Sequence, residues 1–306
     1  MNMTKTFRGL VLSVALATGA LVGTGTAVAQ TKPVPLCDGL ISAPSMWELN
    51  YDPNGAPNVQ DVFNVTLINN GGAACPGRLV VKSLNGDLVL RSTETTQTVP
   101  FYLHLSTPFR DVTPGPDDSQ LNGTDISVPP GQQGILPVIF GVTPGMNLPA
   151  GRYTLPVELE FRTTNNRGNV IAKPVTLVLN VRSSAMLGIK GEFTRHGSAA
   201  VINLGSLETG IKTPATQVYV RSTSGYLLTV SSDNHGYLKH RLPGWSIRYN
   251  MRMGQHDIDL SVPYTINMPV PAAYPDDYPL SFSIGDVENM RAGRYSDTIR
   301  FELMAL

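Results

Sequence analysis

Fifteen residues at positions 292–306 decide how this sequence folds, and they read Ala-Gly-Arg-Tyr-Ser-Asp-Thr-Ile-Arg-Phe-Glu-Leu-Met-Ala-Leu. From Ile299 onward, the apolar residues Ile299, Phe301, Leu303 and Ala305 occupy every second position, which is the pattern of a β-strand with one buried face. The sequence ends with this strand, so the strand lies at the edge of a sheet unless another strand pairs with it. A long apolar edge promotes aggregation. The stretch therefore predicts a strand that requires a partner.

The same pattern occurs earlier, where Ala-Gly-Arg-Tyr at 150–153 leads into Val157, Leu159 and Phe161. This first copy is followed by another alternating segment, 173–183, with Val175, Leu177, Leu179 and Val181 as its apolar residues. That segment could pair with the first copy, or it could pair with the second half of the chain. The second copy has no following strand in the sequence. We therefore expect a complete first half and a second half that lacks a strand.

The first 29 residues have the pattern of a secretory signal peptide. Lys5 and Arg8 precede an apolar segment, and Ala27-Val28-Ala29 forms a small-residue cleavage site before Gln30. A membrane anchor is the alternative, but the apolar segment is short and contains Gly19. We expect an exported, soluble mature chain.

The composition excludes one class of function and favours one class of fold. The sequence has 23 basic and 23 acidic residues, so it lacks the positive charge of a nucleic-acid-binding protein. It has 29 glycines, 24 prolines and 15% charged residues, with many short alternating segments, and this favours an all-β sandwich or barrel. The length suits two such domains. Because the alternation pauses at 183–184, we expect an N-terminal domain at 30–184 and a C-terminal domain at 185–306.

Cys37 and Cys75 are the two cysteines of the sequence. In an exported protein, two cysteines in one domain most simply form a disulfide. A catalytic or metal-binding pair is the alternative, but the sequence has neither a Cys-x-x-Cys spacing nor a cluster of histidines. It also lacks the Gly-x-Ser-x-Gly and His-Glu-x-x-His motifs. We expect a structural disulfide, no metal or other cofactor, and no enzymatic activity.

Four segments of the second half carry a resemblance to a known family: 203–207, 226–236, 246–251 and 292–298. They read Asn-Leu-Gly-Ser-Leu, Tyr-Leu-Leu-Thr-Val-Ser-Ser-Asp-Asn-His-Gly, Ser-Ile-Arg-Tyr-Asn-Met and Ala-Gly-Arg-Tyr-Ser-Asp-Thr. With them the second half resembles the spore coat protein U-like domain, the pilin module of archaic chaperone–usher fimbriae. The first half matches this family only through Gly-Arg-Tyr at 151–153 and its early cysteine.

The resemblance implies two immunoglobulin-like sandwiches, the C-terminal one lacking its last strand. In such pilins a periplasmic chaperone holds the resulting groove open, an outer-membrane usher exports the subunit, and the adjacent subunit then donates a strand. The strand that ends the sequence would form one wall of this groove, and the first apolar residues of the second half would lie in it as well. The expected groove residues are Ile299, Phe301, Leu303, Leu187 and Ile189.

The segment at 30–36 contains Pro33 and Pro35, which makes it a poor strand to donate. A subunit that accepts a strand but donates none lies at the distal tip of the fibre. The sequence therefore looks like a two-domain tip adhesin at the cell surface, which mediates attachment and biofilm formation. The alternatives are an adaptor pilin and a free-standing secreted carbohydrate-binding sandwich; a hydrolase is disfavoured because no nucleophile–base constellation is visible.

Large apolar residues near proline or glycine are the candidates for binding a surface. In an adhesive first domain, the contact should come from loops at the end remote from the second domain. For Trp47, Phe101 and Phe140 we favour the alternative that they are core residues of a sandwich, whereas Met146 and Leu148 are the ones most expected to be exposed. The candidates are Met46, Trp47, Phe101, Tyr102, Phe109, Phe140, Met146 and Leu148.

Overall fold

The computed structural model describes residues 37–54, 59–106, 109–115, 125–164, 171–270 and 275–306. All the regular elements in these ranges are β-strands, so the all-β prediction is confirmed. The described part of the chain contains no helix long and apolar enough to cross a membrane. The expected signal peptide at 1–29 and the segment at 30–36 lie outside the described residues.

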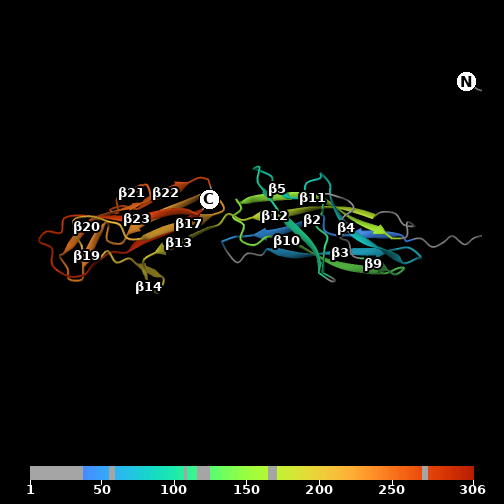
Figure 1. Cartoon of the computed structure of the whole chain (residues 1–306), viewed down its shortest axis with the longest axis horizontal. Coiled ribbons are helices and arrows are strands. Elements are labelled where there is room, and N and C mark those ends of the chain that lie inside the picture. Colours follow the sequence, from blue (N-terminus) through green and yellow to red (C-terminus); the bar gives the residue numbers. More distant parts are fainter. Residues whose placement is uncertain (1–36, 55–58, 107–108, 116–124, 165–170, 271–274) are drawn as a thin grey trace, which may run out of the picture. The chain divides into compact units, whose positions relative to one another are not determined.

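The first half forms two sheets, with strand orders β1-β3-β10-β7-β8 and β2-β12-β11-β4-β9 (Figure 1). The short strands β5 and β6 extend the second sheet beside β11. The strands are β1 (Gly39–Ser42), β2 (Met46–Tyr51), β3 (Gln60–Asn69), β4 (Cys75–Ser83), β5 (Leu90–Ser92), β6 (Thr98–Val99), β7 (Phe101–Ser106), β8 (Phe109–Asp111), β9 (Asp125–Val128), β10 (Gln133–Val142), β11 (Gly151–Thr163) and β12 (Ile171–Val181).

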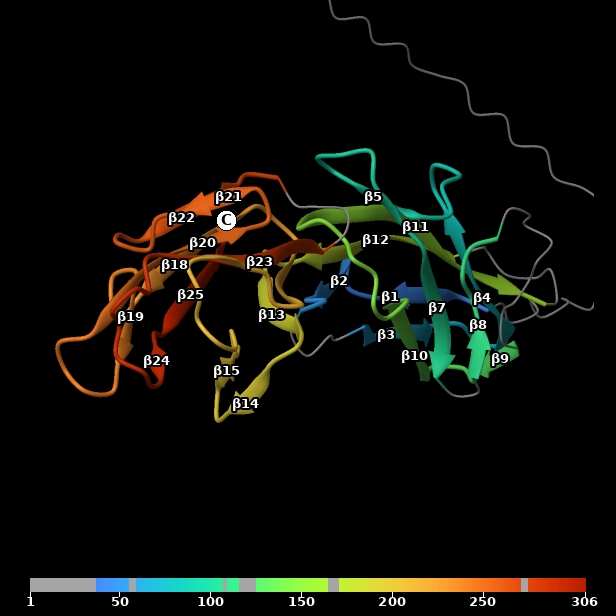
Figure 2. The same ribbon diagram turned by 60° about the vertical axis from the view of Figure 1, so that its left-hand side comes forward.

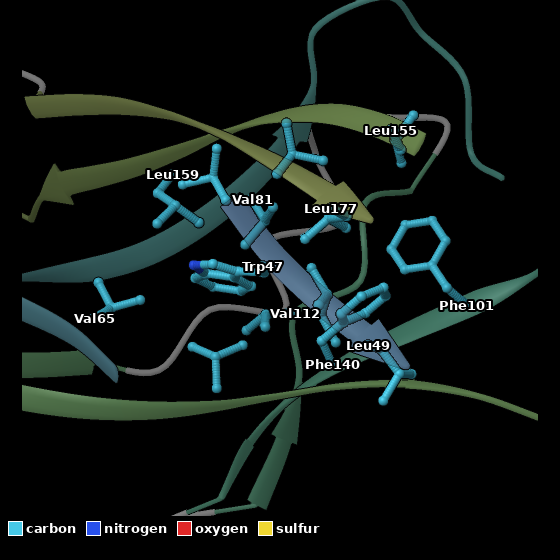
Figure 3. Close-up of a cluster of buried hydrophobic side chains, with 14 of the residues drawn as sticks. Trp47, Leu49, Val65, Val81, Phe101, Val112, Phe140, Leu155, Leu159 and Leu177 are labelled. Carbon is cyan, nitrogen blue, oxygen red and sulfur yellow. The ribbon is translucent and has the colours of Figure 1, made fainter. Parts of the chain in front are cut away.

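The core of the first half is built from the alternating apolar residues of both sheets. Trp47 of β2 is fully buried, and its ring stacks on Phe63 with the ring centres 5.1 Å apart. Side chains from both sheets surround it, among them Val65, Val81 and Leu177 (Figure 3). This two-layer arrangement with a shared apolar interior is a β-sandwich.

The disulfide between Cys37 and Cys75 is present, with the two Cα atoms 5.1 Å apart. It ties Cys37, two residues before the start of β1, to the first residue of β4. The prediction of a structural disulfide is therefore confirmed.

The second half forms a sheet of strand order β13-β17-β23-β20-β19-β24 and another of order β22-β18-β25. In the first of these, β16 also pairs with β23 and β21 with β20, while β14 and β15 form a separate hairpin. The strands are β13 (Ala185–Gly191), β14 (Thr194–His196), β15 (Ala199–Val201), β16 (Gly210–Lys212), β17 (Thr216–Ser222), β18 (Tyr226–Ser232), β19 (Tyr237–His240), β20 (Ser246–Met253), β21 (His256–Ile258), β22 (Tyr264–Met268), β23 (Asp276–Ile284), β24 (Tyr295–Ser296) and β25 (Ile299–Ala305).

The two halves have separate hydrophobic cores. The first draws its buried residues from positions 41–181 and the second from positions 218–284. In the second core, β20 buries every second residue, from Ile247 to Met253. Among the described strands, no ladder joins one before Ser184 to one after it.

Candidate functional site

The two Ala-Gly-Arg-Tyr segments adopt the same local structure. The hydroxyl of Tyr153 donates a hydrogen bond to the carbonyl of Pro149 at 2.9 Å, and the hydroxyl of Tyr295 donates one to the carbonyl of Arg291 at 2.8 Å. Both bonds reach back four residues. A tyrosine that bonds to upstream backbone in this way marks the start of strand F in immunoglobulin-like sandwiches. The glycines two positions earlier, Gly151 and Gly293, have φ angles of 140° and 152°, a backbone region that residues with a side chain rarely adopt.

The two copies also pair with their neighbouring strands in the same way. Each residue of the second copy corresponds to the residue of the first copy whose number is lower by 142. Val157 of β11 pairs with Ser83 of β4, and Ile299 of β25 pairs with Ser232 of β18. Tyr153 pairs with a residue of β5, and Tyr295 pairs in the same way with His240 of β19. Strands β11 and β25 therefore occupy equivalent positions in their two sandwiches.

The two strands differ at their second edge. All along β11, from Gly151 to Phe161, residues pair with the antiparallel strand β12. Strand β12 pairs on its far side with β2. The segment at 173–183 thus pairs with the first copy, as one of the two alternatives predicted. In the described parts of the chain, β25 pairs with β18 alone.

Burial follows this difference in pairing. In the first copy, Val157, Leu159 and Phe161 are at most 1% exposed. Their counterparts Ile299, Phe301 and Leu303 are only half-buried, although they touch the second core. The inward face of β25 therefore has apolar surface that nothing among the described residues covers.

Strand β13 lies near β25. It pairs with β17, and no ladder joins it to β25 in the described residues. Leu187 and Ile189 of β13 are half-buried and pack against the second core. The five residues expected to line a groove thus lie on two neighbouring unpaired edges, on β25 and β13 (Figure 2).

A polar cluster fixes the beginning of β25. The carboxylate of Asp297 accepts hydrogen bonds from the hydroxyls of Ser232 (2.5 Å) and Tyr249 (2.6 Å), and from the backbone N–H of Asn234 (3.1 Å). Burial and the neighbouring Asp297 carboxylate raise the pKa of Tyr249 far above its ordinary value. The turn that follows β18 passes through His235, which has a positive φ angle of 53°. Two of the segments behind the family resemblance, 226–236 and 292–298, are therefore held together at this cluster.

An exposed ion pair holds the outer face of β25. The guanidinium of Arg300 donates to both carboxylate oxygens of Asp233, at 2.7 and 3.0 Å. These hydrogen bonds hold the pKa of the Asp233 carboxyl below its usual range. Strand β25 is thus held by its ladder with β18 on one edge and by the ion pair on its outer face. Its second edge has no strand partner in the part of the chain that the structure describes.

Four of the residues predicted to bind a surface are core residues. Trp47 and Phe140 are fully buried, Leu148 is 8% exposed and Phe101 is 9% exposed. For Trp47, Phe101 and Phe140 the core alternative is the correct one. The expectation that Leu148 is exposed was wrong, because it packs onto the first core.

The expected location of the surface-binding loops was also wrong for the loop at 143–150. Tyr51, the last residue of β2, donates a hydrogen bond from its hydroxyl to the carbonyl of Met146 at 3.0 Å. Tyr51 pairs with Val181, the last residue of β12. The loop therefore lies at the end of the first sandwich from which the chain leaves for the second half. Met146 itself is half-buried.

An exposed aromatic row lies on the outer face of the sheet that contains β7 and β8. Phe109 is 67% exposed, and its ring meets the edge of His104 with the ring centres 4.6 Å apart. His104 in turn lies 4.9 Å from Tyr102, whose hydroxyl bonds to Gln60. The sequence candidates include Tyr102 and Phe109, but not His104, whose ring lies between theirs. Met46, at 45% exposure, is a further exposed candidate.

No protein-family model and no curated protein sequence matches the chain. Solved structures of similar fold include proteins of archaic chaperone–usher pili. One is a chain of the CsuC-CsuE chaperone-tip adhesion subunit pre-assembly complex of Acinetobacter baumannii, with 14% identity and a TM-score of 0.50, covering 87% of this chain and 99% of that chain.

Two further solved structures have lower TM-scores. The CupB6 tip adhesin of Pseudomonas aeruginosa has 10% identity and a TM-score of 0.37, with 88% of this chain and 93% of that chain covered. CfaE, the adhesive subunit of CFA/I fimbria of enterotoxigenic Escherichia coli, has 13% identity and a TM-score of 0.37, with 86% and 93% covered. The similarity at a TM-score of 0.50 shows that the chain shares its fold with the chain from the chaperone-tip adhesion subunit complex.

Proposed function

We propose that this protein is the tip adhesin of a chaperone–usher pilus. The domain at 185–306 accepts a donor strand from the adjacent pilin subunit, and the domain at 30–184 carries the adhesive surface. The segment at 1–29 directs export, and the mature protein reaches the cell surface at the pilus tip. Its role there is attachment and biofilm formation.

The observation that carries the proposal is the contrast between β11 and β25. The two strands share a tyrosine hydrogen bond, a glycine conformation and a pairing register, yet among the described residues only β11 has an antiparallel neighbour on its second edge. The position of β12 beside β11 in the first half thus shows where an added strand would lie beside β25 in the second half. Strand addition from another chain would complete the second sandwich, with main-chain hydrogen bonds for affinity and apolar side chains for specificity.

The partners follow from the same geometry. An apolar groove between two unpaired edges aggregates unless it is covered, so a periplasmic chaperone covers it before assembly and an outer-membrane usher mediates the exchange for the adjacent subunit. A solved structure of similar fold comes from a chaperone-tip adhesion subunit pre-assembly complex, which supports this assignment. The prolines at Pro33 and Pro35 support the tip position, because a segment containing them is a poor donor strand.

The aromatic row of Tyr102, His104 and Phe109 is the adhesive surface that we favour. Phe109 is exposed and contacts the half-buried His104, and Val62 and Ile135 on other strands of the same sheet are more than half exposed; exposed apolar side chains gathered on one face mark interaction surfaces. Of the other sequence candidates, Met46 is exposed but lies on β2, in the other sheet of the sandwich, so we do not include it in this surface.

The groove is tested by placing one new charge on either face of β25. Phe301→Asp puts a carboxylate among the groove residues, whereas Met304→Asp puts one on the outer face, where Met304 is 56% exposed. We expect Phe301→Asp to abolish co-purification with the chaperone and incorporation into fibres, and Met304→Asp to leave both intact. If both variants assemble normally, the groove is not the site of strand addition.

Two alternatives predict different results. An adaptor pilin would show the same response to Phe301→Asp, but its deletion would remove fibres rather than attachment by assembled fibres. A free-standing carbohydrate-binding sandwich would be unaffected by Phe301→Asp, apart from a change in stability, and would need neither chaperone nor usher.

A further inference from the structure

The direction in which a donated strand crosses the groove can be derived from the first half, and this inference rests on the proposed function. Strand β12 runs antiparallel to β11, with Ile171 opposite Phe161 and Val181 opposite Gly151. Transferred by the offset of 142, a donor strand begins opposite Leu303 and ends opposite Gly293. Its carboxyl end therefore leaves the groove beside β24 and β19, where Tyr295 pairs with His240.

The folded body of the donating subunit follows that carboxyl end. A chain that leaves the groove beside Gly293 emerges near the loops at 241–245 and 286–294. These two loops are adjacent, because the rings of His240 and Tyr295 lie 5.0 Å apart and the N–H of His240 bonds to the carbonyl of Trp245 at 3.0 Å. In Figure 2, β24 and β19 lie beside the beginning of β25.

This end of the second sandwich exposes large apolar side chains. Leu242 is 45% exposed, and Trp245 and Met290 are each 37% exposed. Single exposed apolar residues are common on protein surfaces. Three of them on neighbouring loops form a patch, and such patches mark interaction surfaces.

Basic side chains accompany the apolar ones. Lys239, Arg241, Arg291 and Arg294 are all exposed, and no ion pair joins any of them to an acidic residue within the described ranges. The acidic residues on the same loops are Asp286 and Glu288, so the basic side chains are in excess. We call these four basic residues, with Leu242, Trp245 and Met290, the basic end surface.

We propose that the basic end surface receives the folded body of the subunit that donates the strand, and that the facing surface of that subunit is acidic and apolar. Two features support this occupant. The surface is continuous with the exit of the groove, and its unpaired cations are complementary to acidic side chains. Contacts of this kind select the partner and speed its association more than they add affinity.

The test uses the full-length protein and labelled peptides. The base peptide has the sequence of β12, Ile171–Val181, with Lys173→Leu, because Lys173 would lie opposite Phe301. A second peptide adds Glu-Leu-Glu-Asp at the carboxyl end, a third adds Lys-Leu-Lys-Lys there, and a fourth adds Glu-Leu-Glu-Asp at the amino end. Binding is measured by fluorescence anisotropy at low and high salt.

We expect the carboxyl-terminal acidic extension to tighten binding about three- to tenfold at low salt, as two or three exposed ion pairs would. The basic extension should weaken binding. The gain should disappear in Arg241→Glu/Arg291→Glu and persist in Arg195→Glu/Arg221→Glu, which carries the same charge change elsewhere on the second half.

The outcomes separate this inference from the proposed function. If the base peptide binds and Phe301→Asp abolishes that binding, but the acidic extension adds nothing, the basic end surface is not the contact. Equal gains from acidic extensions at both ends would mean unspecific attraction and would also overturn it. If the base peptide does not bind at all, the groove itself fails, and the inference fails with it.

Discussion

Supplying the missing strand in the same chain should stabilise the second sandwich. We would extend the chain after Leu306 by two pieces. The first is a linker as long as the segment 165–170, and the second is a copy of β12 in which Lys173 is replaced by Leu. By the offset of 142, the copies of Ile171, residue 173 and Val175 then lie opposite Leu303, Phe301 and Ile299. The control has the same length, with these three positions changed to Ser.

The expected gain in the free energy of unfolding is estimated by comparing the two fusions. Both order the same number of residues when they dock, so the conformational entropy, about 1–2 kcal/mol per residue, largely cancels. What remains is the burial of three apolar side chains, each worth about 1.5–3 kcal/mol. The apolar fusion should therefore exceed the control by about 4–9 kcal/mol in the free energy of unfolding of this half.

The assay is thermal unfolding followed by circular dichroism, with size-exclusion chromatography for the oligomeric state. A difference of this size shifts the melting temperature of a domain of this length by more than about 10 °C. The apolar fusion should also be monomeric, whereas the unmodified chain self-associates through its open edge. Equal melting temperatures for the two fusions, together with a monomeric unmodified chain, would refute the missing-strand interpretation.

The remaining predictions concern the tyrosine bonds, the disulfide, pH and adhesion. Tyr153→Phe and Tyr295→Phe should each lower the free energy of unfolding by about 0.5–1.5 kcal/mol, the value of one lost hydrogen bond; denaturant unfolding checks this, and a neutral effect of both would contradict the equivalence of the two strands. Cys37→Ala/Cys75→Ala should destabilise the first sandwich by about 3–4 kcal/mol, because the disulfide closes a loop with a sequence separation of 38, and a reducing agent should reproduce this in the parent but not in the variant. Burial raises the pKa of Tyr51, Tyr153, Tyr226, Tyr249 and Tyr278 above the ordinary value of 10.0. A tyrosine whose pKa is higher in the folded than in the unfolded state contributes stability that is complete below pH 10 and is lost as pH rises from the unfolded-state pKa toward the folded-state pKa, so the free energy of unfolding should fall above pH 10; urea unfolding between pH 8 and 11 tests it, and a flat profile would be inconsistent with the burial. Phe109→Ser should reduce attachment of assembled fibres without changing the melting temperature, while Ile211→Ser, at a residue that is 75% exposed on the second half, should leave attachment unchanged.

The sequence predicts the strands well because their patterns are local. An alternation such as Ile247, Tyr249, Met251 and Met253 marks a half-buried strand without knowledge of its neighbours, and β20 buries these four side chains. Two cysteines in an exported chain have few other uses, and the disulfide forms as expected. The pairing of 173–183 was left between two alternatives, because alternation fixes the face of a strand but not its neighbour.

The surface residues could not be predicted in the same way. Whether Trp47 or Leu148 is buried depends on side chains from distant strands, such as Phe63 stacked on Trp47. The end of the sandwich at which a loop lies depends on strand order, which brings the loop at Met146 beside Tyr51. The aromatic row joins Tyr102 and His104 of β7 with Phe109 of the adjacent strand β8, and only their pairing brings these residues together.

The edges of the two halves differ in a way that favours a functional origin for the groove. In the first half, the edge strands β1, β8 and β9 have four, three and four residues, and β2 presents the exposed polar residues Glu48 and Asn50 between its buried ones. Short or polar edges are the usual protection against unwanted pairing. Strand β25 has seven residues, and its inward apolar side chains are half-buried near β13, which within the described ranges pairs with β17 on one edge and with no strand on the other. In the described part of the chain, short or polar strands form the edges of the first half, whereas the long apolar strand β25 of the second half has no ladder on its second edge, and this contrast agrees with our proposal that another chain adds a strand there.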